Sequence, residues 1–226
     1  MYQDDIRTDH AVDGAETKDG RWPRLRRRAG AVALIGGPVA LLAGNALSTV
    51  EAGNDRERMA GLAEQSTGQQ AAVLLFLLAA SLLVAGLICA TGTVRARGAA
   101  LTHAGALLAI PGAVAFAGLV TTWLYDIALA RSLPIAEAAE LSAAAGDTAA
   151  AAVVLIVGLI GLPLGLTLVV AGMWRSGAVP FWAPAAVLVG FVVVSFVDNR
   201  LGGLAGDVLL IVGLGRVGLA VLRSDR

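Results

Sequence analysis

The stretch AAAAVVLIVGLIGLPLGLTLVVAGMW, residues 149–174, decides the class of this protein. It holds 26 consecutive residues without a charged side chain, between Asp147 and Arg175. As a helix rising about 1.5 Å per residue it is roughly 39 Å long, more than the ~30 Å hydrocarbon layer of a bilayer requires. The stretch therefore predicts a transmembrane helix.

Similar apolar runs recur along the rest of the chain. Hydrophobic residues make up 57% of the 226 residues, and mean hydropathy is +0.76, well above a soluble domain. The sequence predicts an all-α membrane protein, a six-transmembrane-helix bundle over residues 29–222. The expected spans are 29–50, 71–94, 99–125, 149–174, 179–197 and 201–222. Residues 1–28 are polar and predict a disordered tail, and residues 223–226 form the C-terminus.

The basic residues are distributed unevenly between the two sides of such a bundle. Thirteen of the 17 fall on the side of both termini, and four, Arg56, Arg58, Arg131 and Arg200, fall on the other. By the positive-inside rule both termini are cytoplasmic, and the expected location is the cell (cytoplasmic) membrane. Trp123 is expected at the outer interface, as aromatic residues commonly are. The net charge of zero gives no reason to expect a nucleic-acid partner.

Two polar loops, residues 51–70 and 126–148, are expected on the outer side. Within the second, residues 133–145 predict a short helix, with Pro134 in its first turn and Gly146 at its end.

Small residues recur every fourth position in the third span, which predicts a helix-packing face. The members are Gly105, Ala109, Ala113 and Ala117. In lipid, close backbone approach at small residues drives helix association, so we expect this stripe to face another helix. Gly36, Ala40 and Gly44 form a similar stripe in the first span. Pro163 is expected to bend the fourth span.

Polar residues gather near the outer ends of the expected helices and predict an outward-facing vestibule. Its candidate members are Asn45, Ser48, Asp126, Asp198, Asn199 and Asp207. Asp207 lies roughly 9 Å into its span, where an ionised carboxylate costs about 2.5–3.5 kcal/mol. A structural role for Asp207, in an ion pair with Arg200 or near Asp126, is the alternative to a substrate or proton site.

Motifs of enzymes are lacking in this sequence. It has no Walker loop, no His-Glu-x-x-His and a single cysteine, Cys89. A Gly-x-Gly-x-x-Gly string at residues 213–218 lies inside an expected span, with no strand before it. We therefore expect no catalytic residues, no metal and no cofactor.

Three stretches carry a resemblance to other proteins. They are GGPVALLAGN at 36–45, GMWRSGAVPFWAP at 172–184 and GLGRVGLAVLR at 213–223. Together they make the chain, over most of residues 30–223, resemble uncharacterised integral membrane proteins of high-GC bacteria, a domain of unknown function. The resemblance implies a membrane-embedded helical architecture and brings no activity with it.

Two functions remain open at this point. The first is a non-enzymatic membrane component or accessory subunit, in contact with the lipid bilayer and with another membrane protein or a second copy. The alternative is a small-solute transporter or receptor using the vestibule around Asp207. A Gly-x-Pro in the first span (36–38) and in the fourth (161–163) suggests two inverted three-helix halves, a plan known in transporters. A lipid-modifying enzyme is the third and weakest hypothesis.

Overall fold

The computed structural model describes residues 21–48, 54–94, 97–197 and 200–223, and this part of the chain consists of helices joined by short turns, without strands. The elements are α1 (Arg21–Leu47), α2 (Asp55–Glu64), α3 (Ser66–Thr91), α4 (Ala99–Ser132), α5 (Ile135–Gly146), α6 (Ala149–Ile156), the π-helix η1 (Val157–Gly161), α7 (Leu162–Arg175), α8 (Trp182–Phe196) and α9 (Arg200–Arg223). The prediction of an all-helical protein is confirmed.

Five helices in the described residues are long and apolar enough to cross a membrane. They are α1, α3, α4, the continuous run α6–η1–α7, and α9. The sixth expected span, 179–197, contains α8, an apolar helix of 15 residues. At 1.5 Å per residue α8 is about 22 Å long, which is shorter than the hydrocarbon layer.

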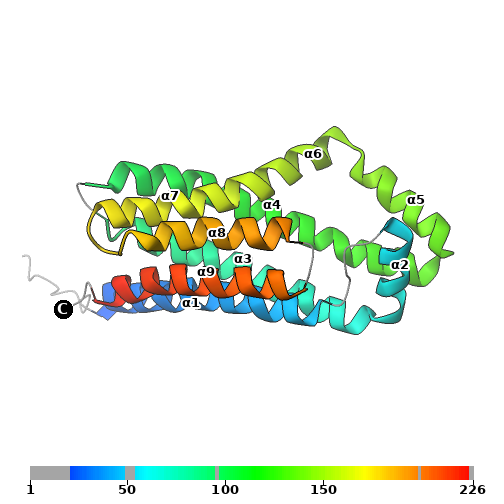
Figure 1. Cartoon of the computed structure of the whole chain (residues 1–226), viewed down its shortest axis with the longest axis horizontal. Helices are drawn as coiled ribbons and strands as arrows, with labels where there is room; N and C mark the ends of the chain where they lie inside the picture. Colours follow the sequence, from blue (N-terminus) through cyan, green and yellow to red (C-terminus); the bar gives the residue numbers. More distant parts are fainter. Residues whose placement is uncertain (1–20, 49–53, 95–96, 198–199, 224–226) are drawn as a thin grey trace, which may run out of the picture.

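The long helices form a closed ring in chain order. α1 packs on α3, α3 on α4, α4 on α7, α7 on α8, α8 on α9, and α9 returns to α1. Neighbours run antiparallel, so Arg21 and Arg223 lie at the same end of the bundle (Figure 1). We call this the terminal end, and the opposite end, which carries α2 and α5, the cap end.

This ring order contradicts the hypothesis of two inverted halves. Inverted halves are related by a half-turn about an axis in the membrane plane. Seen from one side of the membrane, this rotation changes a clockwise order of three helices around the ring into an anticlockwise order. The ring instead runs in the same direction through both halves, α1–α3–α4 and α7–α8–α9, although α1 and α7 are antiparallel. No rotation can therefore relate the two halves, and the two Gly-x-Pro sequences are not equivalent positions of a repeat.

The small-residue stripes lie inside the chain's own helix contacts. A Cβ on Gly105 would be 2.6 Å from the backbone nitrogen of Val169 and 2.7 Å from the carbonyl oxygen of Gly165, so α4 and α7 touch through their backbones. Ala109 and Ala113 are completely buried in the same face, and Ala117 is half-buried. In α1, a Cβ on Gly36 would lie 3.3 Å from Leu82 of α3, Ala40 is buried, and Gly44 packs on Phe76 of α3.

The fourth span bends away from the bundle at its middle. The π-helix η1 precedes Pro163, which has no N–H to donate to the preceding turn, and such a bulge with a proline is a common cause of a kink. Beyond it α6 diverges from the other helices, and none of its residues is buried (Figure 1).

The cap end has more helix than the sequence predicted. The expected loop 51–70 contains α2, which a capping box between Asn54 and Glu57 begins, and it also contains the first turn of α3. α4 continues to Ser132, past the expected end at residue 125. α5 matches the predicted short helix, with Pro134 as its N-cap rather than within its first turn. α2, α4 and α5 share a small core of Met59, Leu62, Ile127, Ala130, Ala138 and Ala139.

The first helix begins earlier than expected. α1 starts at Arg21, so residues 21–28, which the sequence assigned to the tail, belong to a helix. The remainder of the expected tail, residues 1–20, lies outside the described residues.

Candidate binding cavity

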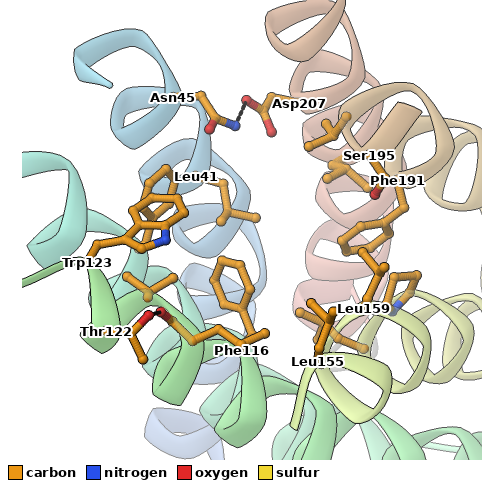
Figure 2. Close-up of a pocket in the computed structure, with 18 residues that line it drawn as sticks. Leu41, Asn45, Phe116, Thr122, Trp123, Leu155, Leu159, Phe191, Ser195 and Asp207 are labelled. Atoms are coloured by element: carbon orange, nitrogen blue, oxygen red, sulfur yellow. Dashed lines mark hydrogen bonds between the residues drawn. The ribbon is translucent and has the colours of Figure 1, made fainter. Parts of the chain in front are cut away.

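A cavity of about 380 Å³ lies inside the ring, in its cap-end half. Every helix of the ring contributes to its lining, so it is a feature of the whole bundle and not a gap between two neighbours (Figure 2). Its volume falls within the range of small-molecule binding sites in proteins. The cavity is open on the side of Leu155 and Leu159, which are half exposed, and its size suits a small ligand.

The walls of this cavity are apolar and aromatic. Phe76, Phe116 and Trp123 form one side, with edge-to-face packing of Phe76 on Phe116 (ring centroids 6.3 Å apart) and on Trp123 (5.7 Å). Phe191 of α8 faces them from the opposite side, together with Leu159 (Figure 2). The indole nitrogen of Trp123 points toward the interior of the cavity (Figure 2).

Asp207 of α9 lies at the cap end of the cavity. Its residue is only 1% exposed. The Asn45 side chain of α1 donates a hydrogen bond from Nδ2 to Oδ2 of Asp207 at 2.7 Å, whereas Oδ1 has no hydrogen-bond partner in the described part of the chain. Oδ1 points toward the cavity in Figure 2. Buried polar atoms are almost always paired, so this oxygen lacks, among the described residues, the partner that a buried carboxylate oxygen normally has.

The structure separates Asp126 from this site. Asp126 lies in the cap, 8% exposed, where Arg58 donates to its Oδ2 at 2.8 Å and Ser142 donates to its Oδ1 at 2.8 Å. It does not line the cavity, and the structure places it apart from Asp207, in contact with Arg58 and Ser142. The reason is that α4 extends beyond the predicted span and carries Asp126 into the cap, where α2 and α5 supply its partners.

The remaining predicted site residues divide between the cavity and its surroundings. Ser48 does not line the cavity but donates a hydrogen bond to Gln69 Oε1 at 3.1 Å. Asp198 and Asn199, and the side chain of Arg200, lie outside the described residues. Of the six predicted members, the structure brings Asn45 and Asp207 together.

The aromatic walls were not predicted from the sequence. Trp123 was expected at the outer interface, but this side chain is half-buried and lines the cavity. A signal was available in α4, where Phe116, Val120 and Trp123 recur at the spacing of one helix face. Gln69, 2% exposed, was also missed because it was assigned to a loop.

Comparison with protein-family models, with curated proteins and with solved structures finds no match to this chain. The site must therefore be interpreted from its own chemistry. Among the described residues there is no group of three metal-ligating side chains, and no second carboxylate lines the cavity beside Asp207. The arrangement is suited to holding a molecule by shape and by one acceptor oxygen.

Proposed function

We propose that this chain is a membrane-embedded receptor or carrier that binds a small, largely apolar molecule inside its helix ring. The observation that carries the proposal is the cavity lined by all six helices of the ring, with one buried Asp207 oxygen directed into it. A partly open pocket of this size, with a buried acceptor that has no partner among the described residues, favours ligand binding.

The hypothesis of an accessory subunit loses one of its two supports. It rested on the lack of enzyme motifs in the sequence, which is unchanged, and on small-residue stripes, which are the usual contact faces between membrane helices. These stripes pack within the chain, between α4 and α7 and between α1 and α3, and so do not present a face to a partner. One observation still favours it: α6 diverges from the bundle with exposed apolar residues, among them Val153, Leu155 and Ile156. It stands as the second candidate function.

We further propose that the chain crosses the membrane six times and that both termini lie in the cytoplasm. α8 lies between α7 and α9 along the bundle and returns the chain from the terminal end to the cap end, which a crossing helix must do (Figure 1). Both ends of the described chain lie together, as an even number of crossings requires. The excess of arginine on that side favours the cytoplasm. The cavity then lies in the outer half of the bilayer.

This orientation is tested with single cysteines introduced into a Cys89→Ala chain. Ala144→Cys places a thiol on exposed α5 at the cap end, and Ser176→Cys places one in the exposed turn after α7 at the terminal end. In intact cells a membrane-impermeant maleimide should label the first variant only. Labelling of Ser176→Cys before lysis would reverse the orientation.

Ligand binding is tested with two compact probes of the same shape, 1-adamantanol and 1-aminoadamantane, and the full chain in lipid nanodiscs. Saturable binding to the unmodified chain should be lost in Leu159→Trp, which fills the cavity from η1. Leu107→Trp is the matched control, because Leu107 is 77% exposed on α4 and does not line the cavity. Absence of saturable binding of both probes, or equal binding by both variants, would contradict the proposal.

A further inference from the structure

We infer that the ligand of this cavity is a lipophilic organic cation, a compact apolar body that carries one ammonium group. The inference rests on the proposed binding function and specifies the chemistry of the molecule bound. It is carried by the position of Asp207 at the end of an aromatic cavity.

The first step concerns the charge of the site. A carboxylate removed from water needs compensation by an opposite charge or by several hydrogen bonds. Asp207 receives one neutral hydrogen bond, from Asn45, and none of the described residues that line the cavity is basic. The helix dipole contributes little, because Asp207 is the eighth residue of α9 and the dipole acts within the first turn. Among the described residues, the lining of the cavity thus supplies no positive charge to Asp207.

The second step concerns where that charge has to be placed. Oδ2 of Asp207 accepts a hydrogen bond from Asn45, and Oδ1, which has no partner among the described residues, points toward the cavity (Figure 2). Oδ1 has almost no accessible surface, so a ligand reaches it once the side chains around it shift. An ammonium N–H of the ligand donating to Oδ1 would satisfy the oxygen and the charge together, as a charge-assisted hydrogen bond. An anionic ligand would face the carboxylate directly, so the site excludes it.

The third step concerns the body of the ligand. Phe76, Phe116, Trp123 and Phe191 present aromatic surface to the cavity, which suits an apolar ligand body. The only hydroxyl groups among the described lining residues are those of Thr122 and Ser195. A sugar or another polyol would lose its hydrogen bonds with water here, whereas an alkyl or aryl body would not.

The experiment compares 1-aminoadamantane, which is a cation at neutral pH, with 1-adamantanol, which is neutral and can still donate one hydrogen bond. Both are titrated into the full chain in nanodiscs by calorimetry, for the unmodified protein, Asp207→Asn and Glu140→Gln. Glu140 is an exposed carboxylate on α5, so its amide variant controls for a change in net charge alone. Empty nanodiscs correct for partition of the probes into lipid.

We expect the unmodified chain and Glu140→Gln to bind the amine at least about tenfold more tightly than the alcohol, and Asp207→Asn to lose this preference. Should Asp207→Asn fail to fold, the comparison of the two probes on the unmodified chain still tests the inference. Equal affinity of the unmodified chain for amine and alcohol would overturn the cation while leaving the binding function intact. Failure of both probes to bind would overturn both proposals.

Discussion

Two buried carboxylates of this protein, Asp126 in the cap and Asp207 in the helix ring, have opposite surroundings. Asp126 is 8% exposed and has both oxygens engaged, by the Arg58 guanidinium and by the Ser142 hydroxyl. Asp207 is 1% exposed and, among the described residues, has one oxygen engaged, by the neutral amide of Asn45. The two carboxylates are buried to a similar degree, but they differ in how many of their oxygens have a hydrogen-bond partner among the described residues.

The difference indicates what each carboxylate contributes. A buried charge whose hydrogen bonds and counter-charge come from its own chain stabilises a local structure, here the contact of α2, α4 and α5. A buried charge left half-satisfied beside a cavity destabilises the free protein and is retained at sites of binding. Burial alone does not distinguish the two, whereas an inventory of their partners does.

The largest effect on stability is expected from Asp126→Ala. It leaves the Arg58 guanidinium without its counter-charge, and because the Arg58 side chain is still 29% exposed we expect about 2 kcal/mol rather than the larger loss of a fully buried pair. Hydrogen–deuterium exchange should accelerate in α2 and α5. Asp55→Ala is the control, since Asp55 is a 60% exposed partner 3.7 Å from Arg58, and it should change little. Similar acceleration in both variants would break the comparison.

A somewhat smaller loss, about 1–2 kcal/mol, is expected from Asn45→Ala, because it leaves the Asp207 carboxylate without any partner in the described chain. Unfolding in a mild detergent measures it. The double variant Asn45→Leu with Asp207→Leu removes both polar groups and should recover most of the loss. Without that recovery, the loss would have to come from packing of α1 and not from the carboxylate.

Ser142→Ala is expected to cost about 1 kcal/mol, because Arg58 still neutralises Asp126 after the hydroxyl is gone. The same exchange measurement on α5 reports it. The neighbouring exposed Ser132→Ala serves as a control at the end of α4. A loss as large as that of Asp126→Ala would mean that the ion pair depends wholly on this serine.

The smallest effect on stability is expected from Asp207→Asn, within about 0.5 kcal/mol and toward greater stability. The change removes a buried charge, and an amide at position 207 can still accept the hydrogen bond of Asn45. Thermal unfolding of the two amide variants, Asp207→Asn and Asp126→Asn, sharpens the comparison directly. Destabilisation of both to the same degree would show that Asp207 is structural too.

Much of the fold follows from the sequence, because a long apolar run that crosses a lipid bilayer forms a helix. The runs that contain α3, α4, α7 and α9 were all predicted as helices, and only their ends shifted. α2 was missed because Asp55, Arg56 and Glu57 make it too polar for a hydropathy argument, although the capping box of Asn54 and Glu57 was visible. Cap helices require capping and packing arguments, which hydropathy does not include.

The site was predictable in part. The cost of a carboxylate within a span singles out Asp207 from the sequence alone, and the position of Asn45 in its own span puts it on the same membrane face. Their direct hydrogen bond joins residues 162 positions apart and depends on the closing of the ring by α1 and α9, which no local pattern contains. Trp123 was misplaced because an aromatic residue near a helix end is typical of the interface, whereas here α4 continues past it into the cap.

The central claim, that Asp207 Oδ1 receives a cationic ligand inside the ring, is tested most directly by crystals of the chain grown with 1-amino-3-bromoadamantane. Anomalous scattering locates the bromine. We predict a bromine peak between Phe116 and Phe191, with the ligand nitrogen about 3 Å from Asp207 Oδ1. A peak only on the lipid-facing surface, or a protein side chain bonded to Oδ1 in place of the ligand, would contradict it.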